Sequence, residues 1–250
     1  MAPDAPKLQK AMAQAGYGSR RACERMIREG KVTVNGKRAN LGLRADPSVD
    51  AIVVDGEPMR GPDPLVYVVL HKPPRVLTSL ASQGGWPTVI DLVDVDTRVY
   101  PVGRLDLESE GLILLTNDGE LAHVLTHPSF AHEKEYRVLL DQHPSENQLR
   151  SWREGVTIVD LGQTAPAKVW IEDRSEPWVG VIMKQGMKRQ IRETARTLGL
   201  KVERIVRVRM ASLELGELES GTWRYLTNHE IEDLRLSVNS PAGARQIHDN

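Results

Sequence analysis

The sequence predicts an α+β protein in which a small N-terminal domain of two helices and a hairpin precedes a larger domain. The larger domain is expected to contain a mixed, largely antiparallel central sheet with flanking helices. Two observations predict this class. Residues 1–60 show helical spacing twice and then a hairpin signal, whereas the chain beyond them alternates many Val-, Ile- and Leu-rich runs with few helical patterns.

The N-terminal domain, residues 1–60, can be followed element by element. KLQKAMAQAG carries apolar residues at helical spacing from Leu8 to Ala15. Ser19 is expected to cap a second helix, RRACERMIREG, which ends at Gly30. KVTVNGKRAN then alternates apolar and polar residues, and its Asn-Gly pair predicts a tight hairpin turn.

A stretch rich in proline and glycine, GEPMRGPDP, indicates a linker, which we place at residues 61–66. In the larger domain, residues 67–236, the expected strands are LVYVVLHK, GLILLT, EYRVLL, AKVWIE, WVGVIM and ERIVRVRM. The expected helices are ELAHVLTH and KRQIRETARTL. Residues 237–250 lose periodicity and are expected to form a disordered tail.

Composition narrows the class of protein. Hydrophobic residues make up 40% of the chain, but no apolar run approaches membrane-spanning length, and the N-terminus lacks the apolar core of a signal peptide. The single cysteine, Cys23, can form neither an internal disulfide nor a cysteine-rich zinc site. We therefore expect a soluble cytoplasmic protein without a membrane partner.

The net charge of −1 hides an uneven distribution. From Lys7 to Arg44 there are ten Lys/Arg against two Glu, and from Lys184 to Arg209 there are nine against two. Residues 45–183 carry eleven basic and twenty-two acidic side chains. One basic block alone could be a solvated helix face, but two such blocks favour a polyanionic partner such as nucleic acid.

The segment DLESEG places Asp106, Glu108 and Glu110 at alternate positions before Gly111, as in the first half of a calcium loop. Position 12 of such a loop requires a glutamate, and here it is Asn117. Calcium binding is therefore disfavoured, and Glu108 and Glu110 are expected to be solvated turn residues. Asp106 stands between two leucines, and the pattern alone leaves a catalytic role and a turn or cap role open.

No other cofactor or nucleophile is predicted. His123 and His127 are four residues apart on a predicted helix, but no glutamate lies between them, so packing near a turn is favoured over a metal site. The chain has no phosphate loop, no dinucleotide fingerprint and no Gly-x-Ser-x-Gly motif. We expect no metal and no nucleotide cofactor.

Two sets of motifs resemble known families. Residues 7–56 resemble the S4 RNA-binding domain, through Gly16-Tyr17-Gly18-Ser19-Arg20-Arg21, Ile27, Gly30, Val32, Val34, Asn35-Gly36 and Asp55-Gly56. The remainder, to about residue 236, resembles pseudouridine synthases of the RsuA/RluB branch. The matching motifs are Lys72-Pro73, Gly85-x-Pro87-Thr88-Val89, Gly103-Arg104-Leu105-Asp106, Thr116-Asn117-Asp118-Gly119, His127-Pro128-Ser129, Lys134-x-Tyr136-Arg137-Val138 and Arg189-Gln190-Ile191-Arg192. Two residues depart from the pattern: Arg75 stands where glycine is usual, and Trp86 where arginine is common.

The resemblance implies an S4 domain followed by a pseudouridine synthase catalytic domain. Such an enzyme breaks the N-glycosidic bond of a uridine, turns the base and rejoins it through C5, without a cofactor. Asp106 would act as a nucleophile at C1′ or as a base at C2′, and the sequence leaves both routes open. Arg192, at the border between the core and basic faces of its helix, is the expected partner of Asp106, and a plain contact to an RNA phosphate is the alternative. Tyr136 would stack on the target base, and Arg104 would fill the space of the flipped base or bind a phosphate.

The resemblance also implies an RNA-binding surface and a substrate. The implied RNA-binding residues are Arg104, Arg20, Arg21, Arg25, Arg28, Lys31, Lys37, Arg38, Lys72, Lys134 and Arg189. The look of the S4 stretch favours members that modify 23S ribosomal RNA of the large subunit, acting as a monomer. The alternatives are an enzyme for 16S ribosomal RNA and a non-catalytic S4-type protein that only binds ribosomal RNA.

Overall fold

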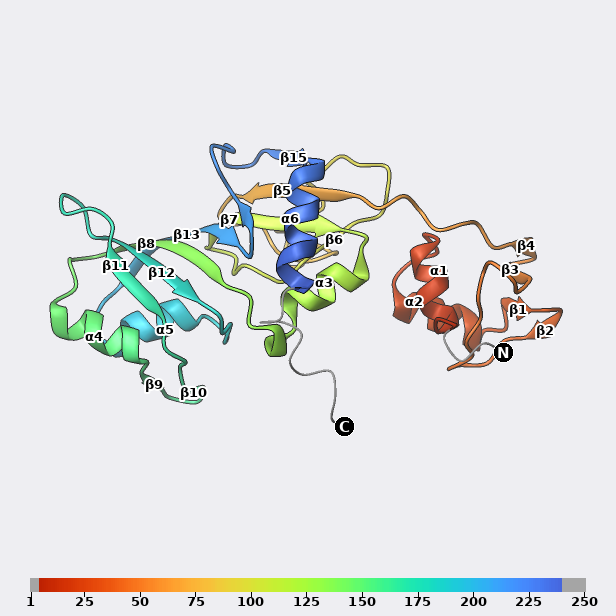
Figure 1. The fold of residues 1–250 in the computed structure, drawn as a ribbon, viewed down its shortest axis with the longest axis horizontal. Coiled ribbons are helices and arrows are strands. Elements are labelled where there is room, and N and C mark those ends of the chain that lie inside the picture. Colours follow the sequence, from red (N-terminus) through yellow and green to blue (C-terminus); the bar gives the residue numbers. More distant parts are fainter. Residues whose placement is uncertain (1–4, 240–250) are drawn as a thin grey trace. The chain divides into compact units, whose positions relative to one another are not determined.

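The computed structural model describes residues 5–239, and the chain divides into two compact units (Figure 1). One unit is formed by the chain up to Leu65 together with Asp96–Arg98. The other is formed by Val66–Val95 and the chain from Val99 onward. The division falls within residues 61–66, which carry no regular structure.

The first unit has the expected order of two helices and a hairpin. Its elements are α1 (Leu8–Gln14), α2 (Arg20–Arg28), β1 (Val32–Val34), β2 (Lys37–Arg38), β3 (Ile52–Val54) and β4 (Glu57–Pro58), and the strands form a sheet in the order β2-β1-β3-β4. The Ser19 hydroxyl caps α2 by accepting a hydrogen bond from the Ala22 amide at 3.1 Å. Asn35 and Gly36 both have positive φ, 52° and 76°, as the two-residue turn between β1 and β2 requires. The buried Cys23 belongs to the apolar core of this unit.

The second unit is built on a nine-stranded sheet. Its main path runs in the order β11 (Lys168–Ile171), β12 (Trp178–Met183), β8 (Lys134–Leu140), β13 (Val202–Met210), β7 (Glu110–Thr116), β5 (Tyr67–Lys72) and β15 (Trp223–Tyr225). β6 (Tyr100–Pro101) pairs with β7, and β14 (Leu213–Glu214) pairs with β13. Only the pair β7–β13 is parallel among the described strands, so the predicted mixed, largely antiparallel sheet is confirmed.

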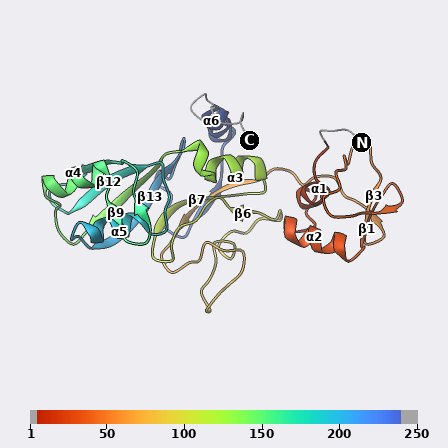
Figure 2. The same cartoon turned by 90° about the horizontal axis from the view of Figure 1, so that it is seen from below.

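Helices cover the sheet in two groups (Figures 1 and 2). α3 (Gly119–Thr126) and α6 (Asn228–Asn239) share an apolar cluster with β5 and β7. α4 (Glu146–Glu154) and α5 (Gln190–Thr197) share another cluster with β8, β12 and β13. A third cluster places residues 76–99 against the other side chains of β5 and β7. Burial on both faces explains why GLILLT is continuously apolar. The short elements are η1 (Pro128–Phe130) and the hairpin β9 (Thr157–Ile158) with β10 (Gly162–Gln163).

Gly111 makes the parallel pairing of β7 with β13 possible. Its φ is +105°, and a Cβ atom there would collide with the backbone oxygen and nitrogen of Arg207 on β13. No side chain can therefore replace this glycine without moving a strand. The close contact fixes the start of β7, directly after the loop that carries Asp106.

Helices α4 and α6 were not predicted, and α6 extends to Asn239, past position 237 where we expected the tail to begin. The expected tail beyond it, residues 240–250, lies outside the described residues. Within residues 5–239, no helix is long and apolar enough to cross a membrane.

Candidate active site

One pocket of the second unit brings together side chains that the sequence singled out. Asp106 and Arg104 come from the loop between β6 and β7, Tyr136 from β8, and Arg192 from α5. Lys134 and Arg189 from the predicted RNA-binding set line the same pocket. The pocket thus lies where a loop, a strand and a helix from distant parts of the chain converge.

The pocket is strongly basic. Asp106 is the only carboxylate among the described residues that line it, which include seven basic side chains. These are Arg104, Lys134, Lys184, Lys188, Arg189, Arg192 and Arg207. A cavity with this charge attracts an anionic ligand and surrounds the one carboxylate with positive charge.

Hydrogen bonds to the backbone hold the Asp106 loop on both sides of the aspartate. Thr78 Oγ1 accepts from the Leu105 amide at 3.2 Å and donates to the Leu105 carbonyl at 2.9 Å. On the other side, the Arg75 amide donates to the Leu107 carbonyl at 2.7 Å. The Ser109 amide closes the turn by donating to the Asp106 carbonyl at 3.1 Å. Because these bonds use backbone groups, the Asp106 carboxylate itself stays available to the pocket.

Lys72 does not have the position that the predicted RNA contact requires. The side chain is fully buried, and its Nζ donates to the backbone carbonyls of Pro73, Leu107 and Ser109 at 2.9, 3.3 and 2.8 Å. Burial lowers the pKa of Lys72 to about 8, against the opposing effect of nearby carboxylates, Glu110 first. Lys72 therefore supports the Asp106 loop from inside, and the RNA-contact assignment is corrected.

Arg192 also supports the loop, but differently from the expected ion pair. Its Nη2 donates to the Glu108 carbonyl and its Nη1 to the Val202 carbonyl, both at 3.3 Å, while its Nε is buried without a partner. No ion pair joins Arg192 to Asp106 within the described part of the chain. The Asp106 charge nevertheless acts on it: burial lowers the pKa of Arg192, Arg189 adds to this, and Asp106 opposes it.

Glu110 was expected to be a solvated turn residue, and this was wrong. It is the first residue of β7, is buried, and accepts two hydrogen bonds from Arg204 at 2.7 and 2.8 Å. Only Glu108 of this pair is exposed. The reason is the strand pairing: β13 runs beside β7 and brings Arg204 to a carboxylate 94 positions earlier in the chain.

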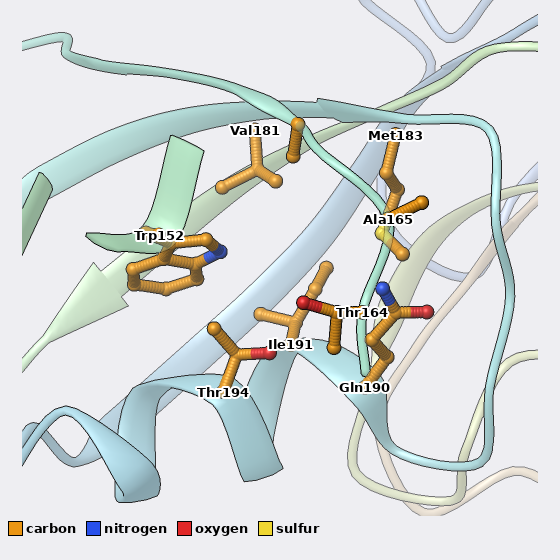
Figure 3. A pocket seen from close by; sticks show the side chains of 9 residues that line it. Trp152, Thr164, Ala165, Val181, Met183, Gln190, Ile191 and Thr194 are labelled. Carbon is orange, nitrogen blue, oxygen red and sulfur yellow. The ribbon is translucent and has the colours of Figure 1, made fainter. Parts of the chain in front are cut away.

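The N-terminus of α5 is shaped by Gln190 and Arg189. Arg189 adopts a left-handed conformation, φ 54°, and Gln190 accepts from the Met187 amide and donates to Gln185 Oε1. These bonds hold together the loop before α5, residues 185–190, which forms one wall of the pocket. A second, small cavity lies next to the pocket, between Trp152 and the first turn of α5 (Figure 3). Ala165, Met183, Gln190 and Ile191 line both cavities.

The other predicted RNA-binding residues lie in the first unit. All of them are exposed: Arg20, Arg21, Arg25, Arg28, Lys31, Lys37 and Arg38. Arg25 and Arg28 lie 4.0 Å from Glu29 and Glu24, and Lys31 pairs with Glu29 at 3.0 Å. Exposed pairs of this kind cost little to break, so the basic side chains can turn to an RNA backbone.

Two features of the pocket were not predicted. The first is Arg207, which lies on β13 and lines the pocket. The second is a cluster of rings: His127 and His132 line the pocket, and Phe130 contacts the ring of His127 and stacks on that of His132. Burial lowers the pKa of His132. The sequence did offer a signal for Arg207, because this arginine stands between two valines inside the apolar run ERIVRVRM. Among the described residues, no group of three or more His, Cys, Asp or Glu side chains is placed to hold a metal ion.

Comparison with known proteins identifies both units. The model of the RNA pseudouridylate synthase family matches residues 66–197, and that of the S4 domain matches residues 7–50. An uncharacterized RNA pseudouridine synthase of Aquifex aeolicus is 35% identical over 237 residues, covering 93% of this chain and 94% of the relative. The ribosomal large subunit pseudouridine synthase B of Bacillus subtilis is 37% identical over 235 residues, covering 92% and 95%.

Two further relatives extend the comparison. The dual-specificity RNA pseudouridine synthase RluF of Escherichia coli is 36% identical over 245 residues, covering 96% of this chain and 82% of the relative. A crystal structure of a pseudouridylate synthase has 30% sequence identity and a TM-score of 0.66, covering 91% of this chain and 99% of that one. The predicted family is thereby confirmed. The chain belongs to the RNA pseudouridylate synthase family, carries an S4 domain, and is an isomerase that acts on RNA.

Proposed function

We propose that this protein converts a specific uridine of 23S ribosomal RNA, in the large subunit, to pseudouridine. The Bacillus subtilis relative named for the large subunit covers nearly the whole chain and supports this substrate. The preference over 16S RNA rests on that similarity. We further propose that the protein acts in the cytoplasm as a monomer.

Asp106 is the proposed catalytic residue. It is the one carboxylate among the described residues of a basic pocket, and this observation carries the proposal. Backbone hydrogen bonds on both sides hold its loop before substrate arrives, so little reorganisation is needed during the reaction. The carboxylate would act at C1′ as a nucleophile or at C2′ as a base.

The neighbouring side chains have distinct proposed roles. Tyr136, half-buried on β8, stacks on the flipped uracil. Arg192 keeps the Asp106 loop in place through Glu108 and adds positive charge near the carboxylate. The exposed Arg104 and Arg189 bind the RNA backbone or fill the space left by the base. The basic side chains of the S4 domain bind flanking RNA.

A tritium-release assay tests the function. RNA transcribed with uridine labelled at C5 loses tritium when the new C–C bond forms, so 23S and 16S transcripts are incubated separately with the protein. We expect release from 23S RNA with the native chain and none with Asp106→Asn, while RNA binding persists.

The control is Glu108→Gln, an exposed carboxylate in the same turn, which should leave release unchanged. Release from 16S RNA alone would replace the proposed substrate by the small-subunit RNA. Binding of the native chain to ribosomal RNA without any release would instead support the non-catalytic alternative, and release by Asp106→Asn would remove Asp106 from the mechanism.

A further inference from the structure

Arg207 is a buried cation whose hydrogen-bonding capacity is largely unused. Its side chain is 2% exposed, and its Nε donates to the Leu112 carbonyl at 2.8 Å. Its Nη2 is buried without a hydrogen-bond partner, and no carboxylate forms an ion pair with it within the described residues. A buried charge without a partner is destabilising, because nothing offsets the loss of its hydration. Such a group calls for a ligand.

Arg207 lies at the inner wall of the active-site pocket. It lines this pocket together with Asp106 and Tyr136. In the antiparallel pair β8–β13 it stands directly opposite Tyr136, so both side chains leave the same face of the sheet, with their Cβ atoms about 5 Å apart. The neighbouring Lys134 is also basic and carries no negative charge that could compensate Arg207. Burial lowers the pKa of Lys134, and the Arg207 charge lowers it further.

The proposed reaction creates an anion in this place. When the C1′–N1 bond of the uridine breaks, its electron pair goes to N1, and uracil becomes an anion with charge spread over N1, O2 and O4. C5 of this anion then forms the bond to C1′, the C5 proton is lost to a base, and N1 takes up a proton. An electrophile beside O2 or O4 stabilises the separated base and hence the cleavage step.

We propose that Arg207 is a further catalytic residue, whose guanidinium donates hydrogen bonds to a carbonyl oxygen of the target uracil and stabilises the departing base as an anion. The proposal rests on the proposed function of the pocket and on Tyr136 as the site of the base. A phosphate is a poorer ligand, because a side chain buried to this degree cannot reach the RNA backbone, which the exposed Arg104 and Arg189 can contact.

Substrates with different leaving groups test this role. The target uridine is compared with 5-fluorouridine at the same position, because the fluorine itself stabilises the uracil anion. The single-turnover rate is measured as disappearance of the target nucleoside. Arg207→Met should slow the reaction of uridine about 100-fold and that of 5-fluorouridine clearly less. Arg207→Lys, which keeps a charge but loses the planar fork, should show the same difference at smaller size.

The matched control is Arg209→Met on the same strand, which pairs with Glu133 and Glu135 and does not line the pocket. It should change both rates by the same factor. Equal losses for the two substrates in the Arg207 variants would overturn the proposal and leave Arg207 a structural role at Leu112. If Arg207→Met does not fold, Arg207→Lys decides by the same comparison. Failure of the native chain to convert uridine would overturn the proposed function instead.

Discussion

At the scale of single residues, Arg75 shows how the Asp106 loop is held at a local energetic cost. Its φ of +63° is a left-handed conformation, which costs a residue with a Cβ about 1–2 kcal/mol. In this conformation its amide donates to the Leu107 carbonyl, next to Asp106. The glycine that is usual at this position in the family pattern would adopt the same conformation without that cost.

Arg75→Gly should therefore stabilise the protein. We expect the free energy of unfolding to rise by about 0.5–1 kcal/mol, since relief of the backbone strain exceeds the greater chain entropy of glycine in the unfolded state. Urea unfolding measures the change. Arg174→Gly, at an exposed arginine with negative φ, should instead be destabilising. A loss of stability in Arg75→Gly as large as in Arg174→Gly would contradict this explanation.

At this scale, it was easier to predict which side chains gather in the pocket than what surrounds them. The family resemblance singled out Asp106, Tyr136 and Arg192, and the structure places all three in one pocket. It could not predict the burial of Lys72 and Glu110, because charged residues are exposed by default and their burial depends on partners far away in the chain. The Lys72–Ser109 and Glu110–Arg204 contacts span 37 and 94 positions. Local patterns contain no information about such partners.

At the scale of elements, the six longer strands were predictable, whereas helices α4 and α6 were not. Runs of β-branched and apolar residues identified the six long strands of the sheet. Helix α6 alternates charged and apolar residues weakly, but its start carries a capping box in the sequence: Thr227, followed three residues later by Glu230. The Thr227 amide donates to Glu230 Oε2 at 2.8 Å, and Thr227 Oγ1 accepts from the Glu230 amide at 3.2 Å. That signature was the missed signal.

Glu230 also ties α6 to β15, which makes it a pH-dependent contact. Arg224 donates to both carboxylate oxygens at 2.7 and 2.8 Å, and this pairing, with help from Thr227, lowers the pKa of Glu230 from 4.5 to about 2. A pKa that is lower in the folded state contributes stability above pH 4.5, which is lost as the pH falls towards 2.

Glu230→Gln should consequently destabilise the protein at pH 7 by about 1–3 kcal/mol, the usual range for hydrogen bonds to a charged group. The difference from the native chain should shrink as the pH falls from 4.5 towards 2. Urea unfolding at a series of pH values measures both effects. Glu232→Gln, an exposed carboxylate on the same helix, is the matched control and should change little. A pH-independent difference for Glu230→Gln would rule out the ion pair as its cause.

At the scale of the whole molecule, charge is divided between two units that we expect to contact RNA differently. The net charge of the chain is only −1, yet one basic block lies in the S4 unit and the other contributes to the pocket wall. Binding of a polyanion depends on how many phosphates are neutralised, and each contact adds to the steepness of the salt dependence. The S4 unit should thus supply affinity without taking part in the reaction.

This division of labour predicts the behaviour of Arg20→Ala/Arg21→Ala, a double variant at two exposed residues at the start of α2. We expect weaker binding to the 23S transcript and a plot of log affinity against log salt whose slope falls by about 0.7–0.9 per lost phosphate contact. The single-turnover rate at saturating protein should stay unchanged, because the Asp106 pocket is intact.

The control, Arg174→Ala/Lys201→Ala, removes two exposed charges of the second unit that do not line the pocket and should leave the slope as it is. Filter binding between 50 and 300 mM salt, on the order of physiological ionic strength, measures the slopes. An unchanged slope with the α2 variant would show that the S4 unit does not contact phosphates there, and a reduced saturating rate would show that it positions the uridine as well as binding the RNA.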